Sequence, residues 1–219
     1  AENLHGVSHG FNEAGMGIYM DRCRFNTFER NALANNSYNL CIDGQETEQY
    51  ENYMDESNTI NGKPICYWIN KKDRTVPTNA ACVLLVNSSN IQVENISASH
   101  NGFGVLLLST TNCTIRNVEA SHNGFGIGLQ LSPGNTLTNN TAVDNIAQGG
   151  IILIGSGDST LRNNTMARNL NNFGVASGPI IVFPDYYNDI DESNLVDDKP
   201  IYYWINQHNK TVPSDGGVA

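Results

Sequence analysis

The chain has 219 residues and is acidic, with 22 Asp and Glu against 12 Lys and Arg and a formal net charge of −10. A nucleic-acid partner requires a basic face, so this balance argues against one. No apolar run approaches the roughly 18 residues of a membrane-spanning helix, so we expect no membrane span in this segment.

Residues 1–42 carry a weak repeat, in which Ile18 and Leu40 stand 22 positions apart. We expect N-terminal solenoid rungs here. The first residues contain neither an initial Met nor a signal sequence, and they resemble the middle of a rung series. We therefore expect the chain to be a segment of a longer repeat protein.

Residues 43–81 interrupt the repeat, and we read them as a first insert. The stretches "KPICYWIN" and "TVP" predict a β-hairpin with "KKDR" as its turn. Tyr67 and Trp68 would cover part of the solenoid.

Residues 82–176 contain the clearest repeat: "SHNGFGV" at 99–105 returns as "SHNGFGI" at 121–127. Looser copies follow at 144–152 and 167–175. A fixed period of 22 to 24 residues indicates one supersecondary unit stacked on copies of itself. The apolar residue after the repeated glycine then forms one stacked row in the core, made of Val83, Val105, Ile127, Ile151 and Val175.

The apolar runs "CVLLV", "GVLLL" and "GIILI" have strand length, and Gly, Asn and Ser flank them. The Leu-x-x-Leu-x-Leu skeleton of leucine-rich repeats is absent, as is a helical stretch between the runs. The sequence therefore predicts an all-β fold, a right-handed parallel β-helix with rungs of about 22 to 24 residues.

Two asparagine rows keep step with the rungs. We expect them to form structural ladders, because asparagine tolerates left-handed backbone and its amide can bond the amide one rung away. The rows are Asn101, Asn123, Asn145 and Asn169, and Asn95, Asn117, Asn139 and Asn163. The repeated glycines, Gly104, Gly126, Gly150 and Gly174, mark either a positive φ or a close backbone approach.

Residues 177–219 form a second insert that repeats the first at an offset of 136, as Trp68 and Trp204 show. The predicted hairpin turn here is "QHNK". The second copy stops at "VPSDGGVA", where the first runs on into a rung.

Five cysteines occur, an odd number without a Cys-x-x-Cys pair: Cys23, Cys41, Cys66, Cys82 and Cys113. Between the two long copies, Tyr202 replaces Cys66 and Val218 replaces Cys82. This exchange with apolar residues favours buried free thiols. The alternatives are an intermolecular disulfide or a Cys23–Cys41 bridge.

Seven Asn-x-Ser/Thr triplets occur, and several lie in the asparagine rows, where such triplets arise by composition alone. Asn87 and Asn209, on predicted turns, are the stronger glycosylation candidates.

The rungs "NTLTNNTAVDN" and "STLRNNTMARN", together with "NGKPICYWIN…TVP", resemble the NosD-type right-handed β-helix repeats, also called the CASH family of carbohydrate-binding proteins and sugar hydrolases. The insert resembles the version in large cell-surface proteins of methanogenic archaea. The resemblance covers the chain from about Ile18 onward. It implies a secreted or surface-exposed solenoid, polysaccharide binding or cleavage in some members, and copper delivery by the name-giving periplasmic member.

Polysaccharide cleavage needs two carboxylates about 5 to 9.5 Å apart. The rung region offers only Glu94, Glu119, Asp144 and Asp158, which form no convincing pair, so we predict no enzyme. The acidic clusters lie in the inserts and read first as solvated loops. A Ca²⁺ site there would use Asp185, Asp189, Asp191 and Glu192, with counterparts at Glu48, Glu51, Asp55 and Glu56. We expect no other cofactor.

His100 and His122 share one slot on neighbouring rungs and could bind copper, although the next slots hold Asp144 and Arg168. A pair of surface histidines is the simpler interpretation. Phe103 and Phe125 also stack in register. Facing outward they would form a sugar platform, but alternation with Val105 and Ile127 favours packing in the core or at a corner.

The first functional interpretation is a structural, extracellular β-helix segment of a surface-layer, sheath or adhesin-like protein, which self-associates into a filament or lattice. The second is a carbohydrate-binding or carbohydrate-cleaving module, with cell-wall polysaccharide as partner. The third is a periplasmic copper-accessory protein.

Overall fold

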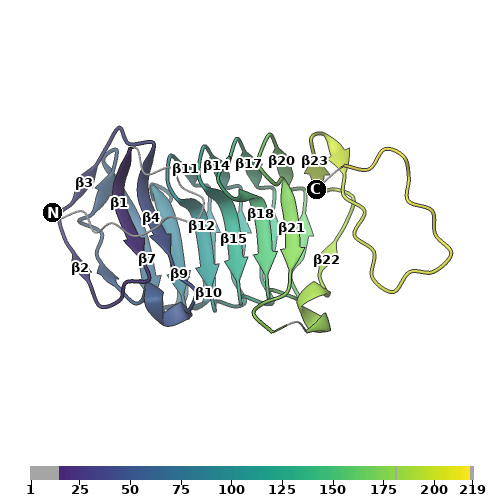
Figure 1. The fold of residues 1–219 in the computed structure, drawn as a ribbon, viewed down its shortest axis with the longest axis horizontal. Coiled ribbons are helices and arrows are strands. Elements are labelled where there is room, and N and C mark those ends of the chain that lie inside the picture. Colours follow the sequence, from purple (N-terminus) through teal and green to yellow (C-terminus); the bar gives the residue numbers. More distant parts are fainter. Residues whose placement is uncertain (1–14, 181, 218–219) are drawn as a thin grey trace.

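Parallel strands stacked rung on rung make up this protein, as a computed structural model of the chain shows (Figure 1). The structure describes residues 15–180 and 182–217. About seven turns of roughly 22 residues form an all-β solenoid, which confirms the predicted fold class. Short strands bounded by Asn, Gly and Ser cannot bury their apolar side chains alone, so each rung is stabilised by its neighbours.

Three sheets run along the solenoid. The large sheet has the strand order β21 (Phe173–Ala176), β18 (Gly149–Ile154), β15 (Phe125–Gln130), β12 (Phe103–Leu108), β9 (Cys82–Val86), β7 (Lys63–Ile69), β6 (Thr59–Ile60), β3 (Ala32–Leu33). The second sheet has the order β22 (Asp189–Ile190), β19 (Thr160–Arg162), β16 (Thr136–Thr138), β13 (Thr114–Arg116), β10 (Ser89–Glu94), β8 (Lys72–Thr75). The third has the order β11 (Ser97–Ser99), β14 (Glu119–Ser121), β17 (Thr141–Val143), β20 (Thr165–Ala167), β23 (Leu195–Val196), β24 (Lys199–Pro200).

The N-terminal rungs add two small parallel pairs, β1 (Met16–Asp21) with β4 (Tyr38–Asp43) and β2 (Thr27–Phe28) with β5 (Tyr53–Met54). Two single-turn 3₁₀ helices, η1 (Thr47–Tyr50) and η2 (Phe183–Tyr186), stand at equivalent places in the two inserts.

The predicted core row is confirmed over four rungs, because Val83 pairs with Val105, Val105 with Ile127, and Ile127 with Ile151. The last member is wrong. Ile151 pairs with Phe173, and Val175 pairs with Leu153. The rung before it holds two extra residues between Asn145 and Ile151, which shifts the glycine-based alignment by two positions.

Two hydrophobic cores result. The central core fills the rungs from β9 onward and includes Val83, Leu107 and Leu129. The N-terminal core includes Leu40, Ile42 and Met54, and it also takes up Leu84 and Leu106 from the outer face of the large sheet. The first rungs therefore cover the outside of the solenoid that follows them.

The asparagine row from Asn101 to Asn169 forms a ladder, but by another geometry than predicted. Asn101, Asn123 and Asn145 are fully buried, and each of the latter two accepts the backbone N–H of the asparagine one rung before, at 3.0 and 2.9 Å. Asn169 accepts the same bond from Asn145 at 2.8 Å, together with an amide-to-amide bond of 2.8 Å. The left-handed residue is the one before each asparagine, with φ between 54 and 60° at His100, His122, Asp144 and Arg168.

The row from Asn95 to Asn163 does adopt left-handed backbone, with φ between 53 and 56°. Its side chains are exposed, and the amide of Asn117 donates to that of Asn95 at 3.1 Å. The buried ladder at this corner lies one residue later, at Asn140, Asn164 and Asn194. Sequence reasoning missed it because Ile96 and Val118 occupy the same slot in earlier rungs.

The repeated glycines mark close backbone approach, as a Cβ on Gly126 would lie 2.6 Å from the carbonyl oxygen of Gly150. Phe103 and Phe125 pair in register as predicted. However, Phe103 packs with Leu106 and Leu108 in the N-terminal core, and not with Val105 in the central one. Simple alternation from Val105 therefore does not predict the side on which Phe103 packs.

Each insert contains a hairpin, but the predicted turns are wrong. "KKDR" is not a turn, because Lys72 to Arg74 belong to β8, which pairs with β10 in a different sheet from β7. The real hairpin pairs β6 with β7 antiparallel around Asn61 and Gly62, whose φ values are 50 and 77°. Its counterpart pairs β23 with β24 around Asp197 and Asp198. Asn-Gly is a strong signal for such a turn, and it was available in the sequence.

Strand β7 contributes to both cores, as β9 and β12 also do, and because it lies in the first insert we call it the joint strand. Ile65 and Tyr67 point into the N-terminal core, while Cys66 and Trp68 contact the central core. It also continues into the rungs, because β7 pairs with β9 and β8 pairs with β10. The first insert is thus where one solenoid ends against the start of the next.

Candidate functional site

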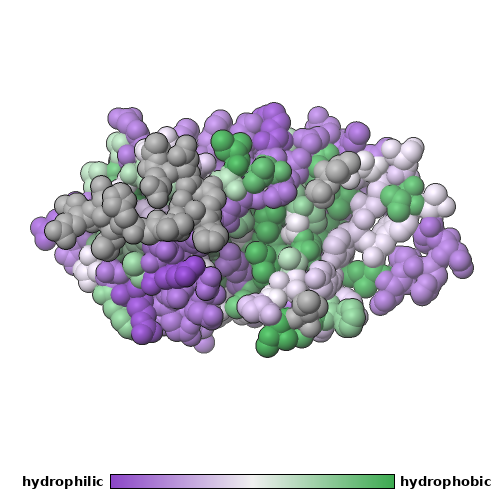
Figure 2. Space-filling model, viewed as in Figure 1, coloured by the Kyte–Doolittle hydropathy of each residue, from purple (hydrophilic) through white to green (hydrophobic). Residues whose placement is uncertain are grey.

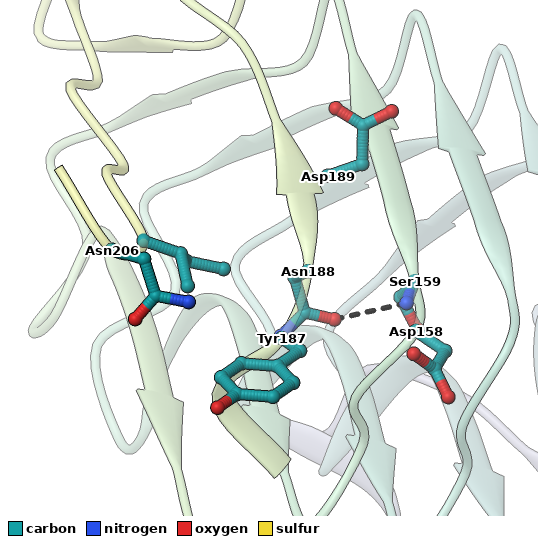
Figure 3. Close-up of a pocket in the computed structure, with 7 residues that line it drawn as sticks. Asp158, Ser159, Tyr187, Asn188, Asp189 and Asn206 are labelled. Atoms are coloured by element: carbon teal, nitrogen blue, oxygen red, sulfur yellow. Dashed lines mark hydrogen bonds between the residues drawn. The ribbon is translucent and has the colours of Figure 1, made fainter. Parts of the chain in front are cut away.

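A groove of about 380 Å³ lies beside the second insert (Figure 3). It lies between the rung of β22 and the strand-like segment after β24. Its walls carry one aromatic ring, two carboxylates and two amides, from Asp158, Ser159, Tyr187, Asn188, Asp189, Ile205 and Asn206.

A corresponding groove of about 280 Å³ accompanies the first insert. Its Asn52, Tyr53 and Ile69 occupy the places of Asn188, Asp189 and Ile205. The two grooves are lined from equivalent positions but differ in their polar groups, since the first groove has Tyr53 where the second has Asp189. The groove therefore follows from the joint architecture, and its polar groups differ between the copies.

Of the two carboxylates that line the second groove, Asp189 is engaged by a neighbouring arginine. Asp189 accepts a hydrogen bond from the Arg162 guanidinium at 2.5 Å, and Asp191 lies 3.1 Å from the same guanidinium. Asn188 is held by a 3.0 Å bond from the backbone N–H of Ser159 (Figure 3). These ion pairs and this hydrogen bond link one rung to the next.

The four predicted Ca²⁺ ligands are not brought together. Asp189 and Asp191 pair with Arg162, and Asp185 accepts the backbone N–H of Gly178 at 3.0 Å. Glu192 lines a separate hollow with Trp204. Asp55 and Asp191, the equivalent aspartates, each accept a hydrogen bond from the serine two residues later. Within residues 15–180 and 182–217, no three His, Cys, Asp or Glu side chains gather in a way that could hold a metal ion.

His100 and His122 stand one above the other, as predicted. Their ring centroids are 5.4 Å apart and their planes differ by 3°. Imidazole lone pairs lie in the ring plane, so two stacked rings do not point at a common ion. In the next slot, the Arg168 guanidinium donates two 2.8 Å bonds to Asp144 and lowers the pKa of that carboxyl. The described residues thus offer two imidazoles and no third donor.

All five cysteines are free thiols in this structure, so the Cys23–Cys41 bridge is not formed, and the intermolecular disulfide stays a prediction. Burial raises the pKa of both Cys41 and Cys82 to about 12, and it also raises the pKa of Cys66. Thiols held protonated are poor metal ligands and poor nucleophiles. The interpretation of these cysteines as apolar core residues is confirmed for Cys41, Cys66, Cys82 and Cys113.

Asn87 and Asn209 are both exposed and both have positive φ, at 47 and 55°. Their use as glycosylation sites stays a prediction. No helix among the described residues has the length and apolar character to cross a membrane.

Comparison with known families gives one match, between residues 68–212 and the NosD family, described as periplasmic copper-binding protein (NosD). This chain belongs to the NosD family. The match begins at Trp68, near the end of the joint strand, and spans the central rungs and most of the second insert of this NosD-family chain. No curated protein matches it.

One solved structure similar to this NosD-family chain is that of a double mutant of the periplasmic alginate epimerase AlgG. The two are 18% identical, with a TM-score of 0.40. The similar region covers 74% of this chain and 35% of the epimerase, so the chain spans about a third of that protein's length.

Proposed function

We propose that this chain is a structural spacer of a protein outside the cytoplasm, in which solenoids built on a 136-residue repeat are joined into a stiff rod. The observation that carries the proposal is the joint strand, whose two faces belong to two successive cores. A flexible linker would let two domains move, whereas a shared strand fixes their relative position.

The surface chemistry supports the same interpretation. Asp189 of the groove and the neighbouring Asp191 pair with Arg162, and the buried asparagine ladder bonds from rung to rung. Polar groups in this protein therefore serve rung-to-rung contact. The exterior placement follows from the family, whose described protein is periplasmic.

We further propose that the rods associate with each other in a surface layer, sheath or filament, with cell-wall polysaccharide as a neighbour. Among the described residues, eleven large apolar residues are well exposed, and six of them lie between residues 180 and 212: Ile180, Val182, Phe183, Tyr187, Trp204 and Val212. Such a cluster at one end of a solenoid is typical of a contact surface.

Sedimentation velocity and negative-stain electron microscopy over a range of concentrations test this proposal. We expect elongated particles that associate as concentration rises. Antibodies against the segment should label intact cells. Compact particles, or labelling only after the cells are permeabilised, would contradict the spacer function, and a strict monomer would remove the self-association.

Copper binding is the second candidate function, favoured by the family description and by the His100–His122 pair. The two imidazoles would have to rotate to share one ion, so we expect a weak site. Copper(II) titration of the protein and of a His100→Ala, His122→Ala variant separates the candidates. Tight binding that the double variant abolishes would favour copper handling over the spacer function.

A further inference from the structure

The two inserts form the same hydrogen bonds at equivalent positions. The backbone N–H of Ile65 donates to Asn58 at 2.9 Å, and that of Ile201 donates to Asn194 at 2.9 Å. The Tyr67 hydroxyl donates to the carbonyl oxygen of Tyr50 at 2.5 Å, as Tyr203 does to Tyr186.

The next contact is also repeated. Ala81 donates its N–H to the carbonyl oxygen of Pro64 at 2.8 Å, which brings β9 alongside the joint strand. Gly217, the counterpart of Ala81, donates to Pro200 at 3.0 Å. Gly217 thus stands beside Pro200 as Ala81 stands beside Pro64.

Beyond this point the copies differ. The joint strand pairs in parallel with β9 over five residues, from Ile65 to Ile69. Its counterpart is assigned as strand only at Lys199–Pro200, and no described residue forms a ladder with residues 201–205. Residues 201–205 therefore continue edge strand β24 without a ladder partner among the described residues, and an unpaired edge is the feature on which β-strand addition acts.

The exposed side chains on this edge are those that the first joint buries. Cys66 is 4% exposed and Trp68 packs against the central core, whereas Tyr202 is half-buried and Trp204 is 38% exposed. Apolar exposure continues on η2 and just before it, with Phe183 79% and Ile180 77% exposed. Figure 2 shows hydrophobic residues both near η2 and over β15 and β18.

We infer that the edge of residues 201–205, with Tyr202 and Trp204, is a docking surface for a further solenoid of the same repeat, which adds a parallel β9-like strand. The first joint defines the register. Trp68 stands beside Leu85 and Ile69 beside Val86, so Trp204 would take a leucine and Ile205 a valine. The inference rests on the proposed spacer function, of which it gives the contact between units.

An extended chain tests the inference within one molecule. Residue 219 is the counterpart of Val83, so a copy of residues 84–132 appended after Ala219 completes the missing strand and supplies about two rungs. The chain has two tryptophans, and Trp68→Phe leaves Trp204 as the single fluorophore. We expect its emission to shift to shorter wavelength, its acrylamide quenching to fall several-fold, and the amides of residues 201–205 to become protected from hydrogen exchange.

The matched control appends the same residues with aspartate at the positions equivalent to Leu85 and Leu107, which lie in the core of the original. This extension should leave Trp204 as accessible as in the unextended Trp68→Phe chain. An extension that stays unfolded, or that folds without covering Trp204, overturns the inference. Either result leaves the particle shape and cell labelling that test the spacer function unaffected.

Discussion

Asn123 shows what a buried amide contributes to a stacked rung. Its Oδ1 accepts the N–H of Asn101 at 3.0 Å, and its Nδ2 donates to the carbonyl oxygen of Ala98 at 3.0 Å. Both backbone groups lie at a corner, where strand pairing is interrupted and water is excluded. One side chain thus satisfies two groups that would otherwise be buried without partners.

Asn123→Ala should therefore lower the free energy of unfolding by about 3 kcal/mol, because it leaves one buried donor and one buried acceptor unpaired. Urea denaturation followed by circular dichroism measures the change. Asn117→Gly is the control, because Asn117 is exposed with a φ of 53° that glycine adopts freely. It should cost less than about 1 kcal/mol. Equal losses of unfolding free energy in the two variants would show that the buried asparagine contributes no more than the exposed one.

The buried thiols predict loss of stability in alkali. Cys82 has a pKa raised from 9.0 to about 12 by burial. Below pH 9 the thiol is protonated in both states, and above it the unfolded chain loses the proton first. The contribution of the Cys82 thiol to the free energy of unfolding is therefore full below pH 9. Above pH 9 it falls by about 1.4 kcal/mol per pH unit as the pH approaches 12.

Cys82→Val removes this titration, and valine already stands at the equivalent Val218. Urea midpoints measured from pH 8 to pH 11 should fall less steeply for the variant than for the unaltered chain. Parallel curves would mean that the thiol ionises equally in both states.

At the scale of the element, the start of each long strand depends on close backbone contact. A Cβ on Gly126 would meet the carbonyl oxygen of Gly150 at 2.6 Å, whereas one on Gly174 would first meet the flexible end of Ile152 at 3.2 Å. Gly126→Ala should cost about 2 kcal/mol or more, and Gly174→Ala less than about 1 kcal/mol. Thermal unfolding of the two variants provides the comparison, and similar losses would contradict the contact-based explanation.

The hairpin turns of the two inserts have different residues at positions with the same backbone conformation. Both central residues have positive φ, and the first copy places Asn61 and Gly62 there while the second places Asp197 and Asp198. Asp197 also accepts hydrogen bonds from Arg168 and Asn172, so only Asp198 is free to change.

Asp198→Gly should therefore stabilise the chain by about 1 kcal/mol, since glycine adopts a φ of 64° without steric cost. The reverse change in the first copy, Gly62→Asp, should destabilise by a similar amount. Calorimetry of both variants measures the pair of effects, and shifts of the same sign would refute the turn argument.

At the scale of the whole molecule, the repeat was readable because stacking demands like residues over like. The spacing from Val83 to Ile151 follows directly from the 22-residue and 24-residue steps. The prediction failed at Val175, where two extra residues in one rung moved the alignment. It failed again at "KKDR", because a change of sheet within one rung and a hairpin turn use the same polar residues.

The joint strand could not be read from the sequence. "KPICYWI" alternates between two faces that are both apolar, and an apolar residue does not reveal which of two cores it enters. The same limit applied to the acidic clusters. Asp189 and Asp191 looked like free oxygen ligands until the fold placed Arg162, 27 and 29 residues earlier in the chain, between them.

A solenoid held by nearest neighbours should open from its ends. Native-state hydrogen exchange should find the slowest amides in β12, β15 and β18, which have partners on both sides, and the fastest in β22 to β24. Uniform protection along the chain would indicate a single cooperative unit.

The joint strand has a mechanical consequence. Tension along the protein passes from one solenoid to the next through a strand whose side chains hold both interiors closed. Peeling it away would expose two cores at once, so the junction is not a weak hinge that gives way first. A rod built from such junctions should resist bending and stretching as strongly between its units as within them.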